Sequence, residues 1–298
     1  MAKVVLGKPG VVRLCMVALL AGEHILLEDV PGVGKTLIGK ALAKSIAAKF
    51  CRIQFTPDLL PSDIVGSSVF NAKTAEFYFS PGPVFANIVL ADEINRTTPR
   101  TQSALLEAMS DSQVSIDGVT HPLPRPFLVI ATQNPFEFEG TYPLPESQLD
   151  RFLLRISVGY PEREDELQVL TIHRQGEPVD ELTPVLDCTQ VASLQQAVRQ
   201  IGVDESLHDY LLDIVEATRN SDELHVGAST RGALCLYRAC QSLALIEGRD
   251  YVVPDDVKRL AVPVLAHRVI TKGYLHGSQR GAVEALIQRL VDDLPVPA

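Results

Sequence analysis

A short glycine-rich segment carries the residue types that hold a phosphate group. An apolar run ends at Glu28, and the chain then passes through Gly32, Gly34, Lys35 and Thr36 into a helix-compatible stretch. Glycines let backbone N–H groups turn towards an anion, and the N-terminus of a helix adds its positive end. In this order a lysine bridges the β- and γ-phosphates of a nucleotide, and the hydroxyl after it ligates Mg²⁺. The residues that we expect to bind a nucleotide, residues 31–37 or the phosphate loop, are Pro31, Gly32, Val33, Gly34, Lys35, Thr36 and Leu37, with Thr36 also a metal ligand.

The first position of this pattern is unusual. Such loops begin with a glycine five residues before Gly34, whereas this chain has Asp29 there. An aspartate is compatible with a turn at the end of a strand. An ordinary Gly-Pro turn is the alternative, but the apolar run before the phosphate loop and the helical pattern after it favour a nucleotide site.

Two adjacent acids follow a second apolar run. Residues 88–91 are apolar, and Asp92 and Glu93 come directly after them. Downstream of a phosphate loop, the first acid holds Mg²⁺ through its water shell, and the second orients or deprotonates the attacking water. Two acids at a strand end are by themselves typical of a solvated surface. Their order after the phosphate loop instead predicts that Asp92 binds the nucleotide and its metal ion and that Glu93 is catalytic.

The elements that must position these residues follow from the apolar pattern. Five short apolar runs end in polar residues, as buried parallel strands do, at residues 25–27, 53–55, 88–90, 127–131 and 153–158. Helix-compatible stretches, including residues 36–49 and 100–110, lie between them. This alternation predicts an α/β sandwich with its chemistry at the carboxyl ends of the strands.

The second half of the chain has a helical period. Apolar residues at 283, 286, 287, 290 and 291 form one stripe of an amphipathic helix, and positions 207, 211, 214 and 215 repeat the pattern. We therefore predict a core at residues 1–160 and a helical domain at residues 161–298, with the proline-bearing stretch 176–184 as a loop inside the second.

Composition limits the partners and the compartment. The chain has 298 residues, 46% of them hydrophobic, and a formal charge of -10. Nucleic acid and anionic lipid repel such a chain on average, which argues against both as partners. The apolar run 11–20 is interrupted by Arg13 and is shorter than the roughly twenty residues of a membrane helix, so we expect no membrane insertion. Five cysteines without paired spacing predict no zinc site and no disulfide framework, and they favour the cytoplasm.

Four motifs together are similar to those of the MoxR family of AAA+ ATPases. They are the phosphate loop, Ala91-Asp92-Glu93-Ile94-Asn95-Arg96, Thr132-Gln133-Asn134-Pro135 and Gly227-Ala228-Ser229-Thr230-Arg231. The resemblance covers nearly the whole chain. It implies a P-loop NTPase (AAA+) core with a five-stranded parallel sheet and an all-α lid domain, and it implies ATP and Mg²⁺ as cofactors. It also implies a homo-oligomeric ring, a hexamer, with ATP at the subunit interfaces.

By the same resemblance, Asn134 matches the first sensor, which helps to place the lytic water. Asn134 follows the apolar run 127–131, at the edge where the ligand is expected, although an Asn-Pro pair is also typical of a turn. Arg151 matches the arginine finger that reaches the γ-phosphate of a neighbouring subunit. The alternative for Arg151 is a surface pair with Asp150 or Glu146.

Arg231 matches the second sensor, on the lid. If Ser229 caps the helix there, Arg231 lies in the first turn, where the helix dipole disfavours a cation. The negative charge of a bound triphosphate would reverse the local field and make an arginine favourable at this position. Arg96 and Arg100 follow the acidic pair and are candidates for the next subunit's surface or for solvent. Val4 to Lys8 resembles the segment near the adenine, before which members of the family usually carry another helical stretch, so we expect a shortened start.

Two segments read as hairpins inserted into the core. Residues 57–83 contain the alternation Phe77-Tyr78-Phe79, and residues 114–122 alternate around Asp117-Gly118. In the resembled family such insertions contact client proteins, whereas aromatic residues also commonly pack beneath a loop.

The leading hypothesis is ATP hydrolysis that drives chaperone-like remodelling or maturation of a protein client. In this family the client is typically a protein with a von Willebrand factor A domain. The alternatives are the motor subunit of a magnesium or cobalt chelatase, and a scaffold that assembles on ATP without sustained turnover. A nucleic-acid motor fits the acidic composition poorly.

Overall fold

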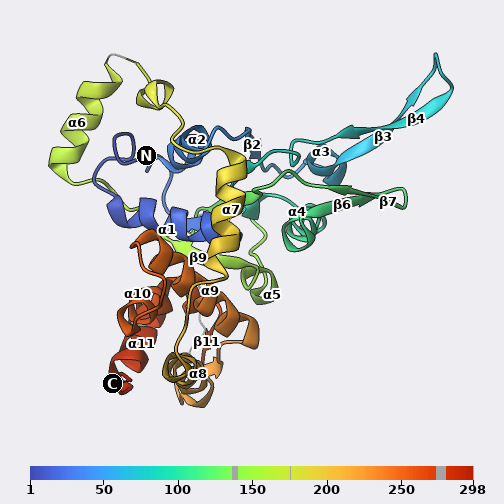
Figure 1. Cartoon of the computed structure of the whole chain (residues 1–298). Coiled ribbons are helices and arrows are strands. Elements are labelled where there is room, and N and C mark those ends of the chain that lie inside the picture. The colour runs from blue at the N-terminus through green and yellow to red at the C-terminus, as the bar shows by residue number, and fades with distance from the viewer. Residues whose placement is uncertain (136–139, 175, 273–279, 298) are drawn as a thin grey trace.

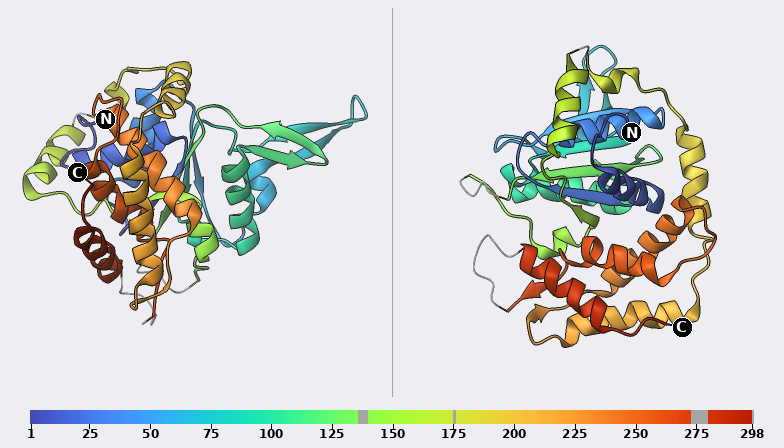
Figure 2. Two further views of the ribbon diagram at one scale, coloured as in Figure 1. Left: turned by 60° about the horizontal axis from the view of Figure 1, so that its bottom comes forward. Right: turned by 90° about the vertical axis from the view of Figure 1, so that its left-hand side faces the viewer.

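The chain forms a sheet-containing core and a helical part that lie against each other. A computed structural model describes all residues except 136–139, 175, 273–279 and 298. The core lies above the helical part in Figure 1 and in the right-hand view of Figure 2. No helix among the described residues is long and apolar enough to cross a membrane.

Five parallel strands form the central sheet in the order β2-β5-β8-β1-β9. Their bounds are His24–Glu28 (β1), Phe50–Gln54 (β2), Ile88–Asp92 (β5), Leu128–Gln133 (β8) and Phe152–Ile156 (β9). Because all five run in the same direction, their carboxyl ends meet at one edge. This sheet and the helices around it confirm the predicted fold class.

The second strand lies earlier in the chain than the apolar run 53–55 suggested. Strand β2 begins at Phe50 and pairs only with β5, so it is an edge strand. Only Ile53 of its five residues is buried. An edge strand with so little buried surface has a weak apolar signal, which explains the shifted prediction.

Alternate residues of the sheet pack against two layers of helices. Leu27 and Ile88 belong to the apolar cluster that includes α1 (Pro9–Ala21) and α2 (Lys35–Ser45). Leu26 and Val89, one position away, belong to the cluster that includes α3 (Pro61–Val65) and α4 (Pro99–Asp111). The sheet is thus buried on both faces, and only its ends are open to a ligand.

Two hairpins extend from the same side of the core (Figure 1). They pair β3 (Gly66–Asn71) with β4 (Glu76–Pro81) and β6 (Gln113–Ile116) with β7 (Val119–Pro122). The aromatic residues of β4 differ in their surroundings. Phe77 is 72% exposed, whereas the ring of Phe79 stacks on His121 with their centroids 4.0 Å apart.

The helical part packs mainly through α9 (Thr230–Ile246), which contacts α1 and α10. The remaining elements are η1 (Ile94–Arg96), α5 (Glu146–Leu149), α6 (Arg163–His173), η2 (Pro178–Glu181), α7 (Cys188–Val198), α8 (Glu205–Asn220), α10 (Pro254–Leu265) and α11 (Arg280–Asp293). A two-stranded ribbon of β10 (Leu224–Val226) and β11 (Ile270–Thr271) adds to the expected helices. The predicted boundary at residues 160–161 falls between β9 and α6 and stays a prediction.

Two histidines are buried in a neutral form. Nδ1 of His24 accepts the N–H of Val129 at 3.0 Å, so Nε2 carries the proton and donates to the carbonyl oxygen of Met109, also at 3.0 Å. Burial lowers the pKa of His24. Burial, followed by the positive charges of Arg268 and Arg155, lowers the pKa of His267 well below its ordinary value.

These histidines predict a loss of stability in mild acid. The unfolded chain takes up protons near the ordinary histidine pKa of 6.5, while the folded chain resists them, so lowering the pH favours unfolding. We expect the free energy of unfolding to fall between about pH 7 and about pH 5, by up to about 1.4 kcal/mol per pH unit for each histidine. Denaturant titrations at several pH values measure this slope. His267→Gln should reduce the slope, whereas the same change at the exposed His225 should leave it unchanged.

Candidate active site

A cavity of about 590 Å³ opens at the carboxyl edge of the sheet. Every residue of the phosphate loop lines it, and so do Asp92, Glu93 and Asn134. We call it the loop cavity. The structure therefore brings together the residues that were predicted from three separate segments of the sequence.

The phosphate loop has the backbone conformation that an anion site requires. Gly32 and Gly34 have φ of 87° and 85°, in the left-handed region that favours glycine. Gly34 is the N-cap of α2, so the first N–H groups of this helix open towards the loop cavity. Nζ of Lys35 donates to the carbonyl oxygen of Asp29 at 2.7 Å. The backbone N–H groups of the loop, the side chain of Lys35 and the helix N-terminus fit a phosphate chain.

The two acids are held from neighbouring strands. Asp92 accepts a hydrogen bond from the hydroxyl of Thr132 at 2.6 Å. The same hydroxyl accepts the N–H of Glu93 at 2.9 Å. Glu93 has a φ of 58°, and a non-glycine residue in the left-handed region costs on the order of 1–3 kcal/mol. Strand β8 thus fixes both acids, and such strain is common where a side chain must be aimed at a reaction centre.

Two residues of β2 complete this cluster, and sequence reasoning missed both. Arg52 donates to one carboxylate oxygen of Asp92 from Nε and Nη2, at 3.0 and 2.6 Å. Gln54 donates to Glu93 at 2.8 Å, and Nε of Arg96 lies 3.3 Å from the same carboxylate oxygen of Glu93. Polar residues at alternate positions of β2 were the available signal, but the strand itself was placed too late in the chain.

Asn134 and Thr36 line the loop cavity together with the two acids. Asn134 directly follows β8, is buried and lines the loop cavity beside the acids. Thr36 is in the first turn of α2 and lines the same cavity as Asp92. Oxygen ligands of this kind suit Mg²⁺, so the described side chains fit a magnesium–nucleotide complex.

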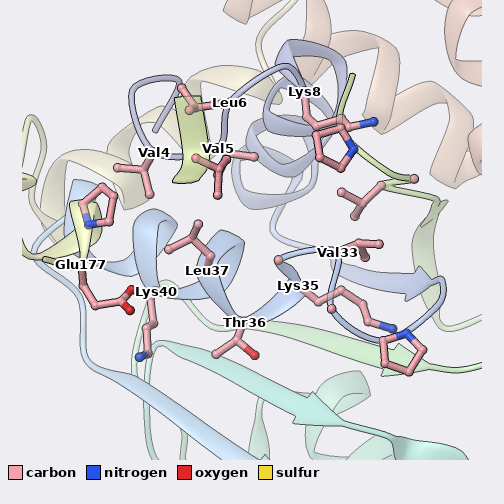
Figure 3. Close-up of a pocket in the computed structure, with 18 of the residues that line it drawn as sticks. Val4, Val5, Leu6, Lys8, Val33, Lys35, Thr36, Leu37, Lys40 and Glu177 are labelled. Carbon is pink, nitrogen blue, oxygen red and sulfur yellow. The ribbon is translucent and has the colours of Figure 1, made fainter. Parts of the chain in front are cut away.

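The other end of the loop cavity is apolar. Val4 and Val5 lie across the cavity from Leu37 in Figure 3. Val169 and Ile172 of α6 line the same space. Apolar walls of this kind fit the flat faces of a purine ring, and the place of residues 4–8 near an adenine stays a prediction.

Arg151 and Arg231 lie elsewhere. Both line a second cavity of about 220 Å³, the arginine cavity, which also includes His24 and Arg238, and neither lines the loop cavity. Arg151 donates to the carbonyl oxygen of Leu106 at 2.7 Å. It also donates to the hydroxyl of Ser110, so the structure does not show the alternative pair with Asp150 or Glu146.

Arg231 is exposed in the first turn of α9, as the sequence suggested. The hydroxyl of Ser229 caps this helix by accepting the N–H of Gly232 at 3.1 Å. The positive charge of Arg231 therefore lies at the N-terminal end of a helix, where the helix dipole disfavours a cation. Arg100 is exposed at the start of α4, whereas Arg96 forms an ion pair with Glu93.

A buried arginine joins the helical part to β9 and to the residue before Arg151. The side chain of Arg268 is 1% exposed and its Nε donates to Asp150 at 2.8 Å. It also donates to the carbonyl oxygens of Phe152 and Leu153 on β9, at 2.5 and 3.1 Å. Asp150 directly precedes Arg151, so this contact fixes the backbone from which Arg151 extends. Nothing in the sequence marked Arg268, because its role depends on contacts with residues far away in the chain.

Family models match both parts of the chain. The model described as the ATPase family associated with various cellular activities (AAA) matches residues 24–154, and an AAA lid domain model matches residues 216–290. The chain is 50% identical to the uncharacterized protein YeaC of Bacillus subtilis, over 99% of this chain and 92% of that protein. It is 42% identical to chaperone MoxR1 of Mycobacterium tuberculosis, over 99% of this chain and 80% of that protein.

Similar solved structures support the same relationship. A crystal structure from Cytophaga hutchinsonii, described as a candidate ATPase, matches with a TM-score of 0.90 and 38% identity, over 100% of this chain and 92% of that one. The likeness to magnesium-chelatase subunits is more distant, at 28% identity over 68% of this chain for subunit ChlI of Synechocystis.

Removing the buried arginine should destabilise the protein. We expect Arg268→Ala to lower the free energy of unfolding by about 3–5 kcal/mol, because Asp150 and the carbonyl oxygens of β9 lose their donor. Arg238 is a matched control, since its pair with Glu23 is partly exposed. Arg238→Ala should cost about 0–1 kcal/mol. Urea titrations of both variants compare the two losses, and equal losses would contradict the assigned importance of Arg268.

Proposed function

Because the chain belongs to the MoxR family of AAA+ ATPases, we propose that it hydrolyses ATP to ADP and phosphate in the loop cavity. The observation that carries this proposal is the convergence of the phosphate loop, Asp92, Glu93 and Asn134 on one cavity. A scaffold that only binds ATP has no need for a carboxylate aimed by a strained backbone. The geometry of Glu93 therefore favours turnover over a binding role alone.

Each residue of the loop cavity has a distinct task in this proposal. The N–H groups of the phosphate loop and Lys35 bind the phosphates, while Thr36 and Asp92 hold the metal ion. Mg²⁺, when bound, neutralises charge on the β- and γ-phosphates. Glu93 takes the proton of the attacking water, and Asn134 orients that water. Gln54 and Arg96 keep the Glu93 carboxylate in place through the contacts described above.

The separation of the two cavities supports a ring of identical subunits. Arg151 and Arg231 do not line the loop cavity of their own chain, and both place a positive charge at the arginine cavity. A neighbouring subunit that places its loop cavity against this surface would receive both arginines. We therefore propose that they act on the γ-phosphate of the next subunit, in a hexameric ring, where such a finger is worth about 10³ to 10⁵ in rate.

The proposed output is the remodelling of a protein client. The hairpin of β3 and β4 extends away from the core and exposes Phe70 and Phe77. A surface of this kind can bind another protein, and we propose a client with a von Willebrand factor A domain. The name of the mycobacterial relative, chaperone MoxR1, supports this class, and the lower similarity to ChlI makes a chelatase motor the weaker candidate.

The described cysteines support a reducing compartment. All five are free thiols, and Cys15, Cys235 and Cys240 are buried. Burial raises the pKa of the Cys15 thiol to about 12, so it stays protonated and unreactive. We propose the cytoplasm as the location.

Glu93→Gln should separate binding from hydrolysis. The amide keeps the hydrogen-bonding shape but cannot take a proton, so we expect ATP to bind while kcat falls by about 10²- to 10⁴-fold. Steady-state phosphate release and a titration with a fluorescent ATP analogue measure the two properties. Glu107→Gln, on the exposed face of α4, is the matched control and should behave as the wild type. Normal turnover by Glu93→Gln would remove Glu93 from its role.

Arg151→Ala should lose ATPase activity by itself and regain part of it when it is mixed with the inactive variant Glu93→Gln. Mixed with Glu93→Gln, some subunits keep Glu93 and receive Arg151 from a neighbour, so we expect phosphate release above the sum of the two separate proteins. Arg231→Ala should complement Glu93→Gln in the same way. If the mixtures show only the summed activities, or if Arg151→Ala is fully active alone, the action between subunits is wrong.

A further inference from the structure

Asp29, the residue at the position where such loops have glycine, has a buried carboxylate with four donors. One oxygen accepts the N–H groups of Val158 and Gly159, at 2.8 and 2.6 Å, and the hydroxyl of Ser157 at 2.8 Å. The other oxygen accepts the N–H of Val30 at 2.8 Å. Residues 157–159 follow β9 directly, so the side chain of Asp29 joins the start of the phosphate loop to the end of a neighbouring strand.

These contacts keep the carboxylate ionised. Burial alone would raise the pKa of Asp29, but the hydrogen bonds from Gly159, Ser157, Val30 and Val158 outweigh it, and the pKa lies below its ordinary value. A carboxylate that accepts several backbone N–H groups is strongly favoured in its charged form. The connection between Asp29 and residues 157–159 is therefore made of charge-assisted hydrogen bonds, which are shorter and stronger than neutral ones.

The hydrogen bonds between Asp29 and residues 157–159 begin where the regular pairing of β1 with β9 ends. Strand β1 pairs with β9 up to Leu27 and Ile156. Beyond this point the main chain of the phosphate loop must turn away to surround the phosphates, and it has no further ladder partner on that side. The carboxylate of Asp29 takes over the contact with residues 157–159 without requiring the loop backbone to follow the strand.

The main chain of the same residue contacts the lysine of the phosphate loop. Nζ of Lys35 donates to the carbonyl oxygen of Asp29 at 2.7 Å. The peptide group of Asp29 is thus fixed by its side chain on one side and contacts the ammonium group on the other. A glycine here would leave that carbonyl free to rotate, because glycine has no side chain to hold it and the widest range of backbone conformations.

We propose that Asp29 is a positioning residue that fixes Lys35 of the phosphate loop through its bonds to residues 157–159. The proposal rests on nucleotide binding in the loop cavity as described above. It assigns to the aspartate a role in binding phosphate that it performs through Lys35, without touching the nucleotide. Gly159 and Pro161 also line the loop cavity, so the hydrogen bonds from residues 157–159 to Asp29 also position one wall of the cavity.

Asp29→Asn is the most direct test, because it keeps the size of the side chain. Asparagine has only one acceptor oxygen, so its NH2 group must face either the N–H of Val30 or the donors of residues 157–159, and the bonds that remain lose the assistance of the negative charge. We expect the Kd for MgADP and the KM for ATP to rise roughly 10- to 100-fold and kcat to fall. Ser157→Ala removes only one neutral donor and should give a smaller change in the same direction. Titration with a fluorescent ADP analogue and steady-state kinetics measure these effects.

A matched control separates positioning from general loss of stability. Asp187 accepts the N–H of Gln190 at 2.8 Å as the N-cap of α7, and it does not line the loop cavity. Asp187→Ala should lower the thermal midpoint without nucleotide but keep the wild-type rise of that midpoint on adding MgADP. In Asp29→Asn this rise should shrink.

The outcomes distinguish this proposal from the one on which it rests. If the wild type binds MgADP and both Asp29→Asn and Asp29→Gly bind it equally well with unchanged kcat, Asp29 only stabilises the fold and the positioning role is wrong. If the wild type itself neither binds MgADP nor releases phosphate from ATP, ATP hydrolysis in the loop cavity fails first.

Discussion

Parallel pairing of the strands is the constraint on which the rest of the structure depends. Because β1, β5, β8 and β9 run in one direction, each releases its chain at the same edge, and each contributes one group there: the phosphate loop, the two acids, Asn134 and residues 157–159. The hydroxyl of Thr132, on β8, contacts both Asp92 and the N–H of Glu93. A shift of one residue in the register between β5 and β8 would break this contact and turn the acids away from the loop cavity.

The same sheet separates the two sets of charged groups. The loop cavity collects the residues that surround the phosphates within one chain, whereas Arg151 and Arg231 gather at the arginine cavity. Arg268 is buried between the helical part and β9 and holds Asp150, which directly precedes Arg151. A contact that stabilises the packing of the lid therefore also fixes the direction of Arg151. Stability and the proposed action between subunits cannot be varied independently at this position.

Much of this arrangement could be predicted from the sequence, because glycine spacing and apolar runs are local signals. The phosphate loop, the acidic pair and the strands β1, β5, β8 and β9 all belong to this class. Strand β2 could not be placed well, since an edge strand buries few side chains, and the two-residue β11 is too short to show a period. Arg52 was missed together with β2. Arg268 was missed for another reason, because its partner Asp150 is distant in sequence and only the folded chain brings the two together.

Glu28 and Asp29 connect the start of the phosphate loop to distant parts of the molecule. Glu28 is buried and lies 3.6 Å from Arg155 of β9 and 3.3 Å from Arg280 of α11. Asp29 binds residues 157–159, as argued above. Two neighbouring carboxylates therefore connect the loop to the last helix of the chain and to the segment that leads to α6. Where nucleotide binding and the contact between Arg280 and Glu28 influence each other, the influence is equal in both directions, because the coupling between two sites is reciprocal. The acids before the phosphate loop lie where such a coupling could pass between the nucleotide and the lid.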